Sequence, residues 1–192
     1  MALNAELARL GVTGALWVAP MGTTTPTGME AWPSGYEDLG YISDDGVTES
    51  VDEDTETFTP WQSSTSIRTE VTRSTKTFQA TLWESKFATI SLFYRVGADE
   101  MTTDQDGVVS FVEQGKPSQD LRSFGLDVID GTYHRRILLP MAEVTERGDV
   151  TYKSDTLIGY EVTVTAYPGA DGVSVKRLFK EGWTVPEVTA PV

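Results

Sequence analysis

A long run of strand-forming residues that carries acids and no bases is the feature that most constrains the fold of this chain. From Leu10 to Ile67 there is no lysine or arginine, yet this stretch holds ten acidic residues. All but one of the 15 basic residues lie at Arg68 or beyond. Blocks of like charge usually mark solvated or disordered segments. This block alternates with valine, threonine and phenylalanine between Val47 and Thr59, which favours an ordered, negatively charged sheet surface.

The same region predicts a β-hairpin longer than most. Strand formers and polar residues recur from Val47 to Leu82, and the most turn-like segment is Pro60–Ser66. We expect arms at residues 49–59 and 67–82, hence a hairpin at 49–82. At about 3.3 Å per residue the longer arm would extend roughly 45–50 Å, whereas a usual strand has about five or six residues. A free hairpin of that length is marginal in water, so its distal part should pack on another copy of the chain.

Composition places the chain among single-domain globular proteins. Its 192 residues can bury a sizeable core, so we expect one domain at 1–192. The net charge of −14 leaves no basic stripe for nucleic-acid phosphates. The absence of cysteine excludes disulfides and thiolate metal sites. No apolar run reaches the roughly 18–20 residues of a membrane span, and residues 1–10 do not resemble a signal peptide. The sequence predicts a protein made in the cytoplasm.

Three segments are expected to lie outside the sheet. An N-terminal arm at 1–14 contains helically spaced leucines: Leu3, Leu7 and Leu10. Residues 20–35 hold three prolines, four threonines and three glycines, which is loop composition. The proline-containing residues 184–192 predict a loose tail.

One strong helix signal spans residues 83–96. Its large apolar residues recur every three or four positions, which predicts a face buried against a sheet. These residues are Trp83, Phe87, Ile90 and Tyr94. Gly97 provides the expected C-terminal stop.

Alternating polar and apolar segments predict an antiparallel sheet around this helix. The expected strands, besides the two hairpin arms, are Ala15–Ala19, Tyr36–Ser43, Val108–Glu113, Asp120–Ile129, Tyr133–Pro140, Ala142–Arg147, Leu157–Tyr167 and Val175–Lys180. Asp-Gly pairs at Asp45-Gly46 and Asp130-Gly131 suit turns with positive φ. The predicted fold is mainly β: an antiparallel sandwich or barrel with one flanking α-helix and a long protruding hairpin.

No motif in the sequence supports catalysis or metal binding. His134 is the only histidine and has no cysteine to join it in a metal site. Asp104 and Asp106 lack the remaining ligands of a calcium loop. The acids of Asp52-Glu53-Asp54 would divide between two strand faces. There is no phosphate-binding glycine loop or nucleophile elbow. We therefore predict no enzyme, no cofactor and no metal site.

Two tryptophans fall outside any periodic core pattern. Trp61 lies at the expected hairpin tip and Trp32 in the proline-rich loop. Local packing, carbohydrate stacking and a protein–protein contact are all open for them, and tryptophan is enriched in protein contacts. The candidate inter-subunit contacts are Phe58, Trp61, Ile67, Trp32, Leu3 and Leu7.

Four segments carry a family resemblance that covers nearly the whole chain. Asp38–Val47 opens the long hairpin, and Thr77–Glu84 leads from a strand toward the helix. Arg136–Pro140 and Gly159–Tyr167 provide closing strands. In this order the segments resemble the major tail protein, or tail tube protein, of long-tailed siphophages, particularly those of actinobacteria.

The resemblance implies a structural virion protein. Its fold would be a β-sandwich with a flanking helix, assembling into hexameric rings that stack into a tube around a tape-measure protein. Further implied partners are the tail terminator and the baseplate or distal tail proteins. DNA would leave through an acidic lumen without specific binding. The protein would reside in the virion tail after assembly in the host cytoplasm.

The acidic block offers candidates for that lumen. Because alternate residues of a strand share a face, we favour Asp52, Asp54 and Glu56 over Glu53. The full candidate set is Asp44, Asp45, Glu49, Asp52, Asp54 and Glu56. Two other functions stay open: a monomeric β-sandwich module that binds carbohydrate or protein through Trp32 and Trp61, and an acidic-site hydrolase, for which no acid stands apart from its neighbours.

Overall fold

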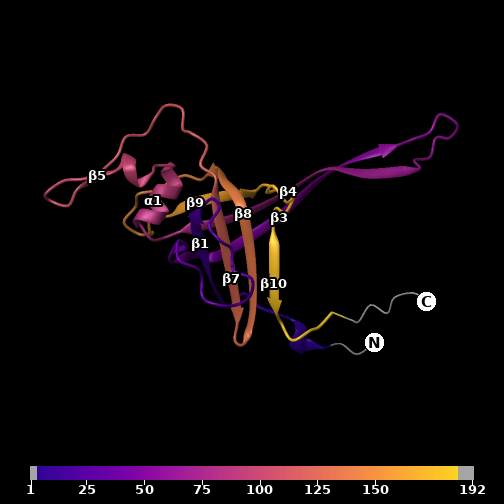
Figure 1. Cartoon of the computed structure of the whole chain (residues 1–192), viewed down its shortest axis with the longest axis horizontal. Coiled ribbons are helices and arrows are strands. Elements are labelled where there is room, and N and C mark those ends of the chain that lie inside the picture. Colours follow the sequence, from indigo (N-terminus) through magenta and orange to yellow (C-terminus); the bar gives the residue numbers. More distant parts are fainter. Residues whose placement is uncertain (1–3, 186–192) are drawn as a thin grey trace.

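The chain forms an eight-stranded antiparallel sheet that bends into two layers (Figure 1). A computed structural model describes residues 4–185. The strand order is β2-β1-β7-β8-β9-β4-β3, and β10 pairs with β8. The strands are β1 (Thr13–Pro20), β2 (Glu37–Asp38), β3 (Ile42–Phe58), β4 (Arg68–Leu82), β7 (Arg122–Asp130), β8 (Tyr133–Arg147), β9 (Tyr160–Ala166) and β10 (Lys176–Lys180). The predicted mainly-β class is confirmed.

Smaller elements lie beside this sheet. They are the 3-10 turns η1 (Ala5–Leu7) and η2 (Ala98–Glu100), the helix α1 (Phe87–Tyr94), and the two-stranded pair β5 (Thr102–Thr103) and β6 (Val109–Ser110). Within residues 4–185, no helix has the length and apolar character to cross a membrane.

The long strand β8 joins the two layers. Up to Ala142 it pairs with β7, and residues 134–138 also pair with β10 on the other side. From Ala142 onward it pairs with β9 instead. A register shift between Val144 and Glu146 marks this part of β8, and bulges bend a strand and increase its twist. Two strands were predicted here, at Tyr133–Pro140 and Ala142–Arg147; the structure forms one continuous strand.

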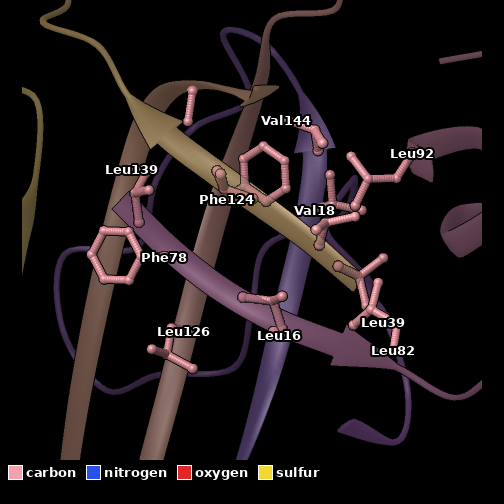
Figure 2. Packing of buried hydrophobic residues seen from close by; sticks show 14 of the residues in the cluster. Leu16, Val18, Leu39, Phe78, Leu82, Leu92, Phe124, Leu126, Leu139 and Val144 are labelled. Carbon is pink, nitrogen blue, oxygen red and sulfur yellow. The ribbon is translucent and has the colours of Figure 1, made fainter. Parts of the chain in front are cut away.

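The core lies between the layers. Alternate residues of β1 and β7 meet those of β4 and β9, and Figure 2 shows the packed side chains. The central residues are Leu16, Val18, Phe78, Leu82, Phe124, Leu126, Val162 and Val164, all less than 5% exposed. An ion pair links the layers beside this core, with Nη1 of Arg177 on β10 donating to Oε2 of Glu49 on β3 at 3.0 Å.

The long hairpin is confirmed. Strands β3 and β4 pair from Ile42–Leu82 out to Phe58–Arg68. The third strand, β9, pairs with β4 only from Lys76 inward. Beyond that point the hairpin has no neighbour and extends away from the body (Figure 1). Its seven paired residues from Asp52 to Phe58 correspond to about 23 Å of free two-stranded ribbon.

The predicted turn at Asp44-Asp45-Gly46 is wrong. Strand β3 begins at Ile42 and continues through these residues, while only Glu37–Asp38 of the expected strand Tyr36–Ser43 precedes it as β2. Gly46 has a φ of 70° and lies within a register shift between Ile42 and Val47. A glycine with positive φ serves a bulge as well as a turn, so the sequence alone could not separate the two.

The helix also differs from its prediction in extent. It begins at Phe87 rather than Trp83, because the backbone N–H of Trp83 donates to the carbonyl of Tyr41 at 2.8 Å and keeps the chain extended. It ends at Tyr94, because the next residue, Arg95, adopts a left-handed φ of 56°; Gly97 is not the stop.

The predicted buried face of the helix is correct only in part, because Ile90 and Tyr94 pack against the core and Phe87 does not. The buried residues are Ala88, Thr89, Ser91, Leu92 and Phe93. Phe87 is 48% exposed, while Ile90 and Tyr94 are only partly buried. The helix is apolar or small on most sides, so residue spacing cannot choose a face and the packing against the sheet decides it.

Other strand predictions match to different degrees. The segment Ala15–Ala19 lies within β1, and the Asp130-Gly131 turn joins β7 to β8 with Gly131 at a φ of 61°. The expected strand Val108–Glu113 shrinks to the two residues of β6, outside the main sheet.

Leu92→Ala tests the observed helix face. Leu92 is 1% exposed, so truncation should leave a cavity and lower the unfolding free energy by about 2–5 kcal/mol. Phe87→Ala is the matched control and should cost less than about 1 kcal/mol. Urea denaturation followed by tryptophan fluorescence measures both. A larger loss for Phe87→Ala would contradict the observed packing.

Candidate functional site: the protruding ribbon

Residues 52–75 form a ribbon that stands free of the sheet. All but two of its residues are exposed, the exceptions being Pro60 and Thr75, which are partly buried. Five acids and two arginines give it a net negative charge. These residues are Asp52, Glu53, Asp54, Glu56, Glu70, Arg68 and Arg73. A two-stranded ribbon without a third strand or a packed face has little stability of its own.

The favoured lumen acids share one face of β3. Nε of Arg73 lies 2.9 Å from Oδ2 of Asp54, and Nη2 of the same side chain lies 3.7 Å from Oδ2 of Asp52. Glu53 lies on the opposite face, where its Oε1 accepts a hydrogen bond of 3.0 Å from Ser74 Oγ. The register shift after Asp54 places the additional residue, Thr72, on β4. Alternation along β3 is therefore preserved as far as Glu56.

Arg73 makes this face less negative than the sequence suggests. Its guanidinium pairs with two of the three favoured acids across the strands. Exposed pairs of this kind contribute only about 0–1 kcal/mol to stability. Their larger effect is on the local field, because one positive charge offsets part of the acidic face. Glu56 stands directly opposite Glu70, and Glu70 is ion-paired with Arg68.

The other three acids lie elsewhere. Glu49 pairs with Arg177, and both side chains are 30% exposed. Asp44 and Asp45 line a groove between the start of β3 and the first half of β1, with a volume of about 730 Å³. The structure thus distributes the six lumen candidates over the ribbon, an interlayer ion pair and a groove. Their position in an assembled tube stays a prediction.

Three exposed apolar side chains lie at the end of the ribbon. Trp61 is 99% exposed, Ile67 is 73% exposed and Phe58 is 42% exposed. Leu7 in η1 is 55% exposed, and Leu3 lies outside the described residues. Among residues 4–185, no group of three or more histidine, cysteine, aspartate or glutamate side chains could hold a metal ion. The ribbon provides an exposed, charged surface that could contact other molecules. We find no group of catalytic or metal-binding side chains on it.

Comparison with known proteins decides the family. The family model described as "Phage tail tube protein" matches residues 1–187. The chain belongs to this family. It is a structural component of the phage tail.

No curated protein matches the sequence. Among solved structures, the cryo-EM structure of the anti-feeding prophage (AFP) baseplate, 6-fold symmetrised, matches at 7% identity and a TM-score of 0.40. That match covers 93% of this chain and 97% of the other, and similarity at this level carries no argument about fold or function.

In this tail tube protein, the acidic ribbon continues into a polar face that is rich in hydroxyl groups and includes Glu161, whose carboxylate accepts a hydrogen bond from Gln79. The strand partners on the face of Asp52 and Asp54 carry hydroxyl and amide groups, namely Thr48, Ser50, Thr75, Thr77, Gln79 and Thr163. Sequence reasoning singled out the charges and overlooked this surface, although the alternating threonines of β4 and β9 signal it. The outer face of β3, β4 and β9 is therefore hydrophilic from the body to the ribbon.

Trp32 packs within the tail tube protein. Its ring centroid lies 5.3 Å from that of Trp17 in a stacked arrangement and 4.8 Å from that of Tyr36. The guanidinium of Arg136 lies 4.4 Å from its centroid. The local-packing interpretation describes this geometry, and stacked neighbours leave little ring surface for a carbohydrate. A role for Trp32 in subunit contacts is untested.

A buried ion pair holds the 20–35 loop in place. Arg136 is 3% exposed and Asp127 is 6% exposed. Nε and Nη2 of Arg136 donate to the two carboxylate oxygens of Asp127 at 2.7 and 3.0 Å. Nη1 donates to the carbonyls of Gly28 and Glu30 at 3.1 and 2.8 Å. Trp32 Nε1 donates to Asp127 Oδ2 at 2.7 Å. This network fixes the loop to the sheet.

The pKa of Asp127 is lowered by this network. Burial alone would raise it, but hydrogen bonds from Arg136, Trp32 and His134 together outweigh burial. A lowered folded-state pKa stabilises the fold above the ordinary aspartate pKa of about 3.9. That stabilisation is lost as the pH falls through the folded-state value.

Asp127→Ala tests the network. It leaves Arg136 buried without its carboxylate, so we expect a loss of about 3–5 kcal/mol in unfolding free energy at pH 7. The difference from wild type should shrink as the pH falls below about 4, because protonation weakens the same pair in the wild type. Urea denaturation over a pH series measures this, with the exposed Asp155→Ala as control. Equal stability of wild type and Asp127→Ala at pH 7 would refute it.

Proposed function

We propose that this protein forms the tail tube of a siphophage through hexameric rings that stack around a tape-measure protein. The observation that carries the proposal is the ribbon, which extends beyond every other strand of its own subunit and is exposed on both faces. Membership of the tail tube family supports it. The single domain at 1–192 would assemble in the host cytoplasm and meet the tail terminator and the distal tail or baseplate proteins at the tube ends.

The ribbon needs a partner for physical reasons. Besides the apolar side chains at its end, it exposes Val71, which is 56% exposed, and Val51 immediately before the ribbon is 53% exposed. A soluble monomer gains nothing from presenting these side chains on an unsupported hairpin. Contact with another copy would bury them and supply the packed face that a two-stranded ribbon lacks.

The acidic face of the ribbon would line the lumen and prevent DNA from adhering. Duplex DNA carries one charge per about 1.7 Å, so even weak attraction at each phosphate would add up along the wall. The Debye length of about 8 Å limits the field to short range at physiological salt. The repeated acids need only ensure that no position along the wall binds a DNA phosphate favourably. These acids are Asp52, Asp54 and Glu56 of every subunit.

Shortening the ribbon tests its role in assembly. Replacing residues 57–68 with a Gly-Asn turn should leave the body folded, because all core residues lie outside this segment. Circular dichroism should report an unchanged fold, while electron microscopy of the concentrated protein should show tubes for the wild type and none for the variant. Normal tubes from the shortened chain would show that the ribbon does not mediate assembly.

Charge reversal tests the lumen. Lysine at positions 52, 54 and 56 should preserve tubes but slow DNA ejection, most strongly at low salt, where attraction is least screened. Neutral Asn and Gln replacements should have a milder effect. Glu53→Lys on the opposite face is the control and should eject DNA at the wild-type rate. Wild-type ejection by the triple lysine variant would exclude these acids from the lumen wall or show that their charge is irrelevant.

A further inference from the structure

A groove borders α1, which lies on the side of the body away from the ribbon (Figure 1). It has a volume of about 330 Å³ and lies between the end of β1, α1 and the start of β7. Its apolar wall consists of Val18, Ala19, Met21, Phe87, Ala88 and Leu121. Met21 is 54% exposed and Phe87 is 48% exposed, although both belong to a wall that contacts the core.

Polar groups converge on the other side of this groove. Nε of Arg122 lies 2.9 Å from each carboxylate oxygen of Asp120. Nη2 of Arg122 donates to the carbonyl and hydroxyl oxygens of Ser91 at 3.2 and 2.9 Å. These four contacts fix the plane of the guanidinium. The exposed Glu37 of β2 also borders the groove.

We propose that the groove receives the ribbon tip of a second copy, with Trp61 as the inserted side chain. This inference rests on the proposed function and specifies the contact by which the ribbon joins subunits. Trp61 has a large apolar body and a donor-only indole N–H, which needs an acceptor when buried. The groove offers an apolar wall, a fixed guanidinium for stacking and the carboxylates of Asp120 and Glu37 as acceptors.

The charges and apolar residues next to Trp61 complement the rim. Ile67 and Phe58 flank the tip and would cover the exposed parts of Met21 and Phe87. Arg68, whose side chain is 68% exposed, follows Ile67 and would approach Glu37. A tryptophan inserted in a desolvated pocket with a polar rim has the character of a binding hot spot.

The positions of tip and groove explain how this contact would propagate. Each copy has one tip and one groove, and α1, which borders the groove, lies on the other side of the body from the ribbon (Figure 1). A contact between different surfaces of identical copies is heterologous and continues from copy to copy, closing into rings or extending into a stack. A two-fold symmetric dimer is a closed assembly and could not grow into a tube.

Cross-linking in assembled tubes tests this contact. The chain has no cysteine, so introduced thiols are unique. Gln62→Cys places a thiol next to an intact Trp61, and Met21→Cys places one at the groove. A short bismaleimide should convert tubes of the double variant into a ladder of covalent oligomers on a denaturing gel. Gln62→Cys with Ala170→Cys, in the turn after β9, is the matched control and should give monomers.

The outcomes separate this inference from the proposed function. A wild type that forms no tubes under any condition overturns both. Tubes that form but give no ladder, or give one equally with the Ala170 thiol, overturn the docking alone. Trp61→Ala and the exposed Phe87→Lys provide a second measurement, and each should slow tube growth roughly tenfold or more without changing circular dichroism. The double variant should be no slower than either single one, because both remove the same contact. Additive losses would refute the contact.

Discussion

The backbone ladder between β3 and β4 is the interaction on which the rest of the structure depends. It begins in the core, where Val47 pairs with Ala80 and Phe78 fills the space between the layers. It then continues past Lys76, the last residue of β4 that pairs with β9, with one register shift after Asp54. The core residues fix the part of the β3–β4 hairpin that packs in the body. The remaining part, the ribbon, therefore projects into solvent. A contact surface is thus presented at a distance from the body by backbone pairing alone.

The remaining structure divides into surfaces that are fixed within the subunit and surfaces left for other molecules. The Arg136–Asp127 pair ties the 20–35 loop down and engages Trp32 within the subunit. Such a buried pair is costly to break and contributes order more than net stability. Trp61 makes no comparable contacts and, at 99% exposed, is the most exposed aromatic side chain among residues 4–185.

The negative charge of the ribbon is partly neutralised by arginines on the same ribbon. Arg73 offsets part of the field of Asp52 and Asp54, and Arg68 does the same for Glu70. Together with the hydroxyl-bearing face of β4 and β9, this gives a surface that is hydrophilic and weakly negative. A conduit for a polyanion needs a wall without binding minima, and a mixed polar wall with a modest negative excess meets that requirement.

The sequence by itself determined the features that depend on local chemistry. Alternation along β3, β4 and β9 predicts strands because a pleated strand exposes every second residue, and Asp130-Gly131 predicts its turn because glycine accepts positive φ. The resemblance to phage tail tube proteins was confirmed at the level of the family. Tertiary structure alone decided the rest. Gly46 could serve a turn or a bulge, and pairing with Ala80 chose the bulge. The helix is apolar on most sides, so the sheet chose Leu92 over Phe87. The register of β3 and β4 places Arg73 opposite Asp54. Arg136 contacts the carbonyls of Gly28 and Glu30, which lie 108 and 106 residues away in sequence, and only the packing of the 20–35 loop on the sheet brings them together.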